Sequence, residues 1–456
     1  MASQNSTNFS LATEVLISLI LASTVILFTT VFEKPLSYNN GLGWDGSIYY
    51  HMANQISQQQ PLVDEAPYVY RLGIPFLVGI FFPHNLIWGF KTANLIGSFL
   101  SIFLLLILLR KYIKNWVVRM VLMYFFVSQW LGPLRTTLFY PTQIEPWDNA
   151  IILLQFVFLF NLHENRSKLY LFLFALISFL GVIIRESTIL VPFMYFVAGI
   201  AENSSTQDNI INRQKIQAWF LNLIPLFGGT CGYLFTHVIA SPNNSYSILG
   251  IAILWAYQKP MPAYLYSYFV TLGPMIAIFY PARAVIKNFL INHQTEYYYL
   301  LSILILAWVI GSDTDRFLYW AMPVWYILFG LALEYIWPVL RKFWGLLLLL
   351  LLTQCISQRS FLPIPDYAPE KIEYRIPLLT VICNDGCTLD VSSYNGLTGS
   401  GINAALCSVI PCYFNKNIEP LKLYLLMENI FVTLLLLLGI VQAQKTMRKL
   451  QDQLIC

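Results

Sequence analysis

The sequence predicts an all-α protein, a polytopic bundle of about twelve helical segments that cross a membrane. Of its 456 residues, 57% are hydrophobic and only 11% are charged. Apolar runs of roughly 15–24 residues follow one another along the chain, as is typical of membrane helices. Basic residues gather in every second connection between these runs. The net charge of +4 does not indicate a nucleic-acid partner.

The first apolar run follows a polar N-terminus, residues 1–10, which lacks the basic region of a cleaved signal peptide. We therefore expect the run at 11–32 to be retained as a signal anchor. Several later runs are shorter than the roughly 20 residues that span a bilayer, so some segments should be tilted, broken or re-entrant. The predicted membrane segments are about 11–32, 86–109, 117–133, 147–162, 169–184, 187–201, 218–239, 263–281, 297–311, 316–337, 343–357 and 421–442.

The distribution of basic residues predicts the orientation. Alternate connections are rich in Lys and Arg, and the positive-inside rule places these connections and both termini in the cytoplasm. The opposite short connections contain only isolated cations, at Arg135, Arg185, Lys259 and Arg316. The cytoplasmic set is Arg110, Lys111, Lys114, Arg119, Arg166, Lys168, Arg213, Lys215, Arg283, Lys287, Arg341, Lys342, Lys445, Arg448 and Lys449.

The large first outer loop, about 33–85, is predicted to contain two interfacial elements. Residues 47–60 place Ile48, Met52 and Ile56 at helical spacing, which favours an amphipathic helix along the interface. The apolar stretch 72–83 is too short to span and should be interfacial or re-entrant. This loop belongs to a predicted membrane unit over 1–357.

A second outer loop, 358–420, is rich in Pro, Gly, Asn and Ser, and a last membrane helix with its tail occupies 421–456. The loop contains four of the seven cysteines. An even set of cysteines in an oxidising compartment favours two structural disulfides. Zinc is the alternative, although the spacing differs from common zinc knuckles and the loop has no His. The cysteines are Cys383, Cys387, Cys407 and Cys412.

Short polar clusters interrupt the apolar runs at positions that should all lie on the outer face. Ionisable groups at membrane depth are costly, so their gathering at one face favours a site. No phosphate-binding Gly-rich loop, zinc-binding His-Glu-x-x-His helix or internal repeat is visible. The clusters are 41–46, Tyr70 with Arg71, Arg135, Glu145 with Asp148, Arg185 with Glu186, and 311–316.

The first outer loop reads Gly-Leu-Gly-Trp-Asp-Gly at 41–46, followed by Tyr-His-Met-Ala at 50–53 and Tyr-Arg at 70–71 before Pro75. A later stretch, 313–323, runs from Asp-Thr-Asp-Arg to Met-Pro. These stretches resemble the C-type glycosyltransferases (the GT-C superfamily), polytopic enzymes that use polyprenyl-phosphate sugars. Many relatives have a paired acidic motif in this loop, whereas the acidic residue here stands alone, which leaves the use of a divalent cation open.

The resemblance implies that Asp45 is the essential acidic residue. A carboxylate near an acceptor hydroxyl can take its proton as general base. Asp before Gly also favours a turn, which is the structural alternative. Arginine forks suit phosphate oxygens, so the outer-face arginines are candidates to hold the donor phosphate, and internal salt bridges with Glu186, Asp315 or Glu145 are their alternative. These arginines are Arg185, Arg316, Arg135 and Arg71.

Four further residues are weaker candidates for acceptor or sugar binding. Glu145 and Asp148 could bind sugar hydroxyls, hold a divalent cation with Asp45, or cap the helix expected near 147. Trp44 could stack on a sugar ring or anchor the loop at the headgroup level. His51 could line the same cavity as Asp45 or serve as a structural polar group.

The resulting hypothesis is a glycosyltransferase, inverting by expectation, that moves a sugar from a polyprenyl-phosphate donor to a lipid-linked or other extracytoplasmic acceptor. The alternative is a transporter or flippase for a lipid-linked or anionic solute, although such proteins often contain repeats and midplane charges. Of five Asn-x-Ser/Thr sequons, only the one at Asn243 is predicted to lie outside. This slightly favours a plasma (inner) membrane over the endoplasmic reticulum.

Overall fold

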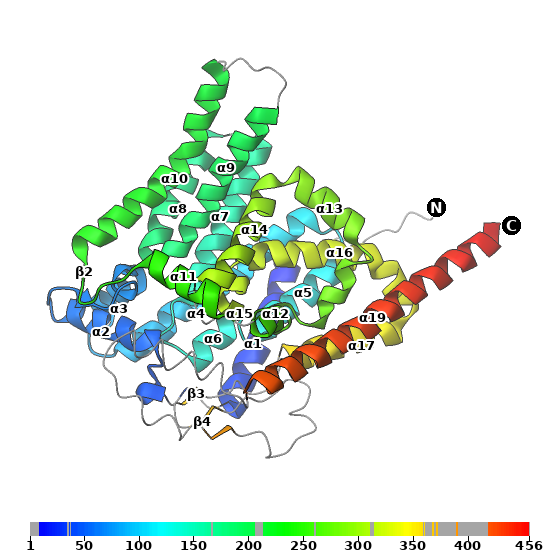
Figure 1. Ribbon diagram of the computed structural model, residues 1–456, viewed down its shortest axis with the longest axis horizontal. Coiled ribbons are helices and arrows are strands. Elements are labelled where there is room, and N and C mark those ends of the chain that lie inside the picture. Colours follow the sequence, from blue (N-terminus) through cyan, green and yellow to red (C-terminus); the bar gives the residue numbers. More distant parts are fainter. Residues whose placement is uncertain are drawn as a thin grey trace.

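A computed structural model shows a helical bundle with three very short strand pairings (Figure 1). The structure describes residues 9–33, 36, 38–165, 167–205, 213–259, 261–310, 314–358, 360, 367–368, 371–372, 389–390 and 418–455. The four cysteines of the predicted disulfides, Cys383, Cys387, Cys407 and Cys412, lie outside these residues.

Five stretches in the described part are long and apolar enough to cross a membrane, which fits an integral membrane protein. Shorter apolar helices of 10–17 residues accompany them. The long stretches are Leu11–Phe32, Leu86–Tyr112, Trp116–Phe139, Met322–Lys342 and Leu426–Leu450.

The helices of the N-terminal half form the larger part of the buried core, with the predicted first outer loop, about 33–85, folded at one end. Its helices α2 and α3 lie beside each other in Figure 1. The bounds are α1 Leu11–Phe32, α2 Asp45–Ser57, α3 Gly73–Phe81, α4 Leu86–Tyr112, α5 Trp116–Ser128, α6 Pro133–Phe139, α7 Glu145–Asn165, α8 Lys168–Ile184, α9 Leu190–Ser205 and α10 Arg213–Ile239, with 3₁₀ turns η1 Tyr38–Gly41, η2 Tyr68–Tyr70 and η3 Glu186–Ile189.

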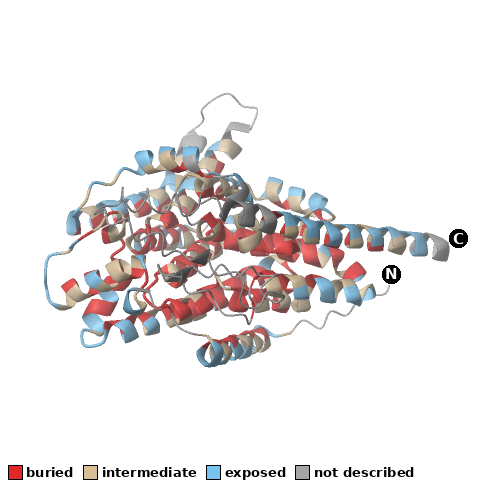
Figure 2. Cartoon of the chain, turned by 60° about the horizontal axis from the view of Figure 1, so that its bottom comes forward, coloured by how far each residue is buried: buried red, intermediate tan, exposed pale blue. Residues whose placement is uncertain are grey.

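The C-terminal half is more broken. Helix α16 is buried within the bundle, whereas α19 packs alongside α17 and extends beyond it. The described residues of the last turns of α19, up to Leu450, are mostly exposed or half-buried (Figure 2). The bounds are α11 Ile248–Gln258, α12 Met261–Leu272, η4 Pro274–Phe279, α13 Arg283–Asn292, α14 Gln294–Val309, α15 Thr314–Tyr319, α16 Met322–Lys342, α17 Trp344–Ser357 and α19 Ile418–Ile455, with strands β1 Val63–Asp64, β2 Ser241–Pro242, β3 Tyr367–Ala368, β4 Lys371–Ile372 and β5 Leu389–Asp390.

The predicted amphipathic helix of the first outer loop is confirmed as a helix, α2, in which Tyr49 and Met52 are fully buried. Helix α3 occupies the predicted short stretch and exposes Phe76 and Phe81, at 52% and 70% of their surface. Exposed aromatic side chains on a helix too short to span are typical of an element at the membrane interface.

The predicted segment at 263–281 is wrong as a single helix. It divides at Gly273, whose φ of +68° lies in the left-handed region, into α12 and η4. Gln354 from α17 stabilises the break: its Nε2 donates to Leu272 O at 2.9 Å, and its Oε1 accepts from Met275 N at 2.9 Å. The amide thus replaces backbone hydrogen bonds that the break leaves unmade inside the bundle.

Several contacts gather the predicted cytoplasmic connections at one end of the bundle. Buried Glu14 on α1 pairs with Arg119 and, at 3.0 Å, with Arg110. Glu334 Oε1 on α16 accepts a hydrogen bond at 2.6 Å from Asn115 N, which precedes α5. Lys111 reaches Glu164 at the end of α7 at 3.3 Å. These contacts connect α1, α4, α5, α7 and α16 at the same end.

Replacing Glu14 should destabilise the bundle strongly. Glu14→Ala leaves two guanidinium groups without their buried carboxylate, and breaking a buried pair costs about 3–5 kcal/mol. Lys111→Ala removes the exposed pair with Glu164, which is worth about 0–1 kcal/mol. We expect a large decrease in the thermal midpoint in detergent for the first variant and almost none for the second. Equal decreases would contradict a structural role for Glu14.

Candidate functional site

Side chains from four separate parts of the chain meet at the end of the bundle opposite the ion pairs of Glu14 with Arg110 and Arg119. Arg316 on α15 contacts Asp45 at the start of α2, with Nη2 3.3 Å from Oδ2, and also pairs with Glu145 at the start of α7. Arg185, the residue after α8, donates from Nη1 to Glu145 Oε1 at 2.8 Å. Asp148 is 3.7 Å from the same Nη1. We call these five residues the charge cluster.

The carboxylates of the charge cluster lie where helix ends favour them. Asp45 is the first residue of α2, Glu145 is the first residue of α7, and Asp148 lies in the first turn of α7. The N-terminal end of a helix has partial positive charge and free N–H groups, which stabilise carboxylates there. The helix ends thus bring three carboxylates close together, and Arg185 and Arg316 pair with them.

Two of the sequence predictions about these carboxylates are corrected. Helix α7 begins at Glu145, not near 147, so Asp148 does not cap it. Instead, buried Asp148 accepts a hydrogen bond from Ser187 Oγ at 3.2 Å and faces Arg185. The alternative of an internal pair of Arg185 with its neighbour Glu186 is also corrected, because Arg185 pairs with Glu145 and Asp148.

The Glu145 carboxylate is shared between two cations, and this determines its ionisation. Burial opposes the charged form, but the guanidinium groups of Arg316 and Arg185 outweigh it and lower the pKa of Glu145 to about 2. Gln143, with its amide oriented to suit its neighbours, donates to Glu145 Oε2 at 2.6 Å and accepts from Arg316 Nη2 at 3.1 Å. Glu145 is therefore ionised at any physiological pH.

The arginines of the cluster differ in accessibility. The Arg316 side chain is 24% exposed and Asp45 is 16% exposed, whereas Arg185 is only 3% exposed. The Arg185 guanidinium lies 5.0 Å from the ring centre of Trp320, and within the described residues its buried Nε makes no hydrogen bond. Asp45 and Arg316 form the accessible edge of the cluster, and Arg185 forms its buried base.

The loop that presents Asp45 packs against the segment before α7. The Tyr140 hydroxyl accepts a hydrogen bond from Gly46 N at 2.8 Å, and Thr142 Oγ1 donates to Leu42 O at 2.8 Å. A Cβ at Gly46 would lie 2.0 Å from Thr142 Oγ1, so only glycine permits this approach. Asn94 on α4 holds the same segment by donating from Nδ2 to Pro141 O at 2.7 Å. Tyr140, Thr142 and Asn94 carry no sequence signal that would have identified them.

Arg71 lies beside the charge cluster in a pair of its own. Its Nε donates to Glu186 Oε2 at 2.8 Å, and its Nη1 donates to the Tyr49 hydroxyl at 2.8 Å. Burial opposes ionisation of Glu186, but the Arg71 charge lowers the pKa of that carboxyl. The Arg71 guanidinium also lies 5.0 Å from the ring centre of Tyr68. The carboxylate of Asp45, followed by burial, raises the pKa of the Tyr68 hydroxyl, which therefore remains neutral.

In the part of the chain that the structure describes, the remaining predicted residues make no ion pair within the charge cluster. Arg135 is buried, pairs with Glu33 and donates from Nη1 to Ser128 O at 3.1 Å, so its alternative as an internal ion pair is realised with Glu33 and not with Glu145. His51 contacts Asp64, with Nδ1 2.6 Å from Oδ2, and its side chain is 59% exposed. Trp44 is 42% exposed, and its ring packs edge to face on Tyr140 with centroids 6.2 Å apart.

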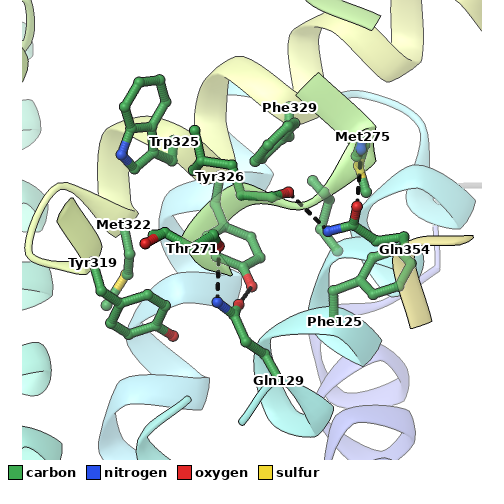
Figure 3. A pocket seen from close by; sticks show the side chains of 12 residues that line it. Phe125, Gln129, Thr271, Met275, Tyr319, Met322, Trp325, Tyr326, Phe329 and Gln354 are labelled. Carbon is green, nitrogen blue, oxygen red and sulfur yellow. Dashed lines mark hydrogen bonds between the residues drawn. The ribbon is translucent and has the colours of Figure 1, made fainter. Parts of the chain in front are cut away.

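Within the described residues, no group of three or more His, Cys, Asp and Glu side chains is arranged to hold a metal ion. The carboxylates of the charge cluster are directed at arginines instead. A cavity of about 10 Å³, large enough for a single water, lies deeper in the bundle among α5, α12, α16 and α17 (Figure 3). Gln129 bridges across it from Thr271 O at 3.0 Å to the Tyr326 hydroxyl at 2.8 Å, and its lining contains none of the predicted site residues.

No protein-family model matches the chain, and no curated protein is significantly similar to it.

The stability that ionised Glu145 contributes should be lost only in strongly acidic solution. Because the pKa of Glu145 is lowered from its ordinary 4.5 to about 2, its contribution to folding is complete above pH 4.5 and is lost as the pH falls toward 2. The difference in thermal midpoint between the wild type and Glu145→Gln should be constant from pH 5 upward and shrink below. A difference that grows on acidification would contradict the assigned charge state.

Proposed function

We propose that the chain is a membrane glycosyltransferase that moves a sugar from a polyprenyl-phosphate donor to an extracytoplasmic acceptor. The observation that carries the proposal is the contact of Asp45 with Arg316, 3.3 Å apart, within a cluster that also contains Arg185. The cluster thus brings together a candidate general base, Asp45, and two candidate phosphate ligands. Asp45 and Arg316 lie at its accessible edge, and Arg185 lies buried behind them. The motif resemblance of the first outer loop supports the same assignment.

The proposed chemistry is a direct displacement. The acceptor hydroxyl attacks the anomeric carbon, Asp45 takes the hydroxyl proton, and the bond from that carbon to the phosphate oxygen breaks. The phosphate leaves with the bonding electron pair, and a single displacement of this kind inverts the anomeric centre. Asp45 suits the role of base because it is 16% exposed and lies at the mouth of the cluster.

The arginines would stabilise the negative charge on the departing phosphate. Arg316 is the primary phosphate ligand, because it is the more exposed of the two arginines and its Nη2 already contacts carboxylate oxygens. Arg185 adds a buried positive charge behind it. Arg71, in its pair with Glu186 and Tyr49, acts as a positioning residue for the loop. Arg135 has no part in this mechanism.

The other candidates have secondary roles in the proposal. Exposed Trp44, next to Asp45, is placed to stack on a sugar ring, and Glu145 with Asp148 positions the two arginines. We further propose about twelve membrane segments, with the charge cluster on the extracytoplasmic face and both termini in the cytoplasm. The enzyme would act in the plasma membrane on a lipid-linked or other extracytoplasmic acceptor.

Asp45→Asn should reduce sugar transfer by about 100-fold or more, since general-base catalysis contributes roughly 10²–10⁴-fold. The measurement is transfer of radiolabelled sugar in membranes supplied with a panel of polyprenyl-phosphate hexoses and pentoses. Glu65→Gln is the matched control, because it removes a carboxylate of the same loop outside the charge cluster. Protein amount and thermal midpoint should be unchanged in both variants.

Full transfer by Asp45→Asn would show that Asp45 is not the base. Absence of donor-dependent transfer by the wild type, together with uptake of an anionic or lipid-linked solute into proteoliposomes, would replace the enzyme with a transporter or flippase. Proteoliposomes of the same preparation therefore serve as the second assay.

A further inference from the structure

The basic end of the bundle, opposite the charge cluster, contains an open groove of about 610 Å³ between the α16–α17 junction and α19. Lys342 and Trp344 form one wall, and Gln442 and Thr446 form the other. Its size lies within the roughly 300–1,000 Å³ of small-molecule sites. The groove lies apart from the charge cluster and does not depend on the function proposed for it.

Helices α17 and α19 approach each other closely beside the groove. A Cβ at Gly439 would lie 3.1 Å from the Leu346 side chain, so glycine allows α19 to approach α17 closely there. Beyond this crossing Gly345 has nothing within 4 Å of where its Cβ would be. Small residues therefore form the floor of the groove, and longer polar and aromatic side chains form its rim.

Lys342 lines the groove, and further cations lie on the neighbouring turns. Lys342 and its neighbour Arg341 are exposed at the end of α16, and Lys445, Arg448 and Lys449 are exposed on the adjoining turns of α19. In the described part of the chain no carboxylate pairs with any of these five cations. The arginines of the opposite end, in contrast, are all paired. The groove therefore has a charge that a ligand could neutralise.

Trp344 indicates that the groove lies at the headgroup level of a membrane. It is 71% exposed beside Lys342, and Trp next to Lys at a helix end is typical of the headgroup level of a membrane. Leu434, Leu435 and Leu438 on α19 are also exposed, so apolar surface continues from the groove along the helix. A ligand with a negative headgroup and an apolar tail matches both features.

We propose that this groove binds an anionic phospholipid of the leaflet at the basic end of the bundle. The phosphate contacts Lys342 and is attracted by the positive charge of nearby Lys445, the glycerol lies over the floor formed by Gly345 and Gly439, and one acyl chain follows the exposed leucines of α19. Binding there would hold α19 against α17.

The test is native mass spectrometry of the full chain in detergent, titrated with phosphatidylglycerol or phosphatidylcholine. The wild type should bind phosphatidylglycerol in clear preference. Each surface cation contributes roughly fivefold to binding of an anionic lipid, so Lys342→Ala with Lys445→Ala should weaken binding roughly 30-fold. The matched control removes Arg283 and Lys287, two exposed cations on α13 outside the groove, and should bind as the wild type does.

Equal binding of the two lipids by the wild type, or equal losses in the groove and control variants, would overturn the proposal and leave only a non-specific basic surface. Because all four cations are exposed, the variants should fold, and an unchanged thermal midpoint without lipid checks this. A third variant, Gly345→Leu, fills the floor without changing charge and should also displace the phosphatidylglycerol.

Discussion

The shared carboxylate of Glu145 is the interaction on which the polar end of the bundle depends. It lies at the start of α7 and receives Arg185 from the end of α8 and Arg316 from α15, and Arg316 in turn reaches Asp45 on α2. Breaking a buried pair is costly because the remaining charge stays unsolvated. One carboxylate therefore ties the first outer loop to helices distant in sequence and holds Asp45 beside a cation.

The charges at this end are arranged as partners of one another. The charge cluster contains three carboxylates and two arginines, and the neighbouring pair of Arg71 with Glu186 is balanced. A doubly charged phosphate cannot simply be added to such a cluster. It has to compete with Asp45 or Glu145 for Arg316, and the exposure of Arg316 makes that exchange geometrically accessible.

Local sequence patterns predict the helices well but not the partners of the charges. The segment predicted at 11–32 is α1, because Ser10 and Glu33 bound a continuous apolar run. The alternative of internal ion pairs holds for these arginines, but with other partners than the sequence offered for two of them: Arg185 pairs with Glu145 40 residues away, and Arg135 pairs with Glu33 102 residues away. Ion pairing depends on which helix ends meet in the fold. Hydrophobic periodicity predicts single helices but carries no information about which of their ends meet. The break at Gly273 was also missed, although a Gly-Pro pair marks it.

The measurement that tests the central claim most directly is equilibrium binding of a short-chain polyprenyl phosphate to the purified protein, by calorimetry in detergent. The wild type should bind it, and Arg316→Gln should weaken binding roughly tenfold or more, because a hydrogen-bonded charge is lost. Arg283→Gln, at an exposed cation on α13, should bind as the wild type does. No binding by the wild type, or the same affinity in Arg316→Gln, would contradict the assignment of the charge cluster as a phosphate site.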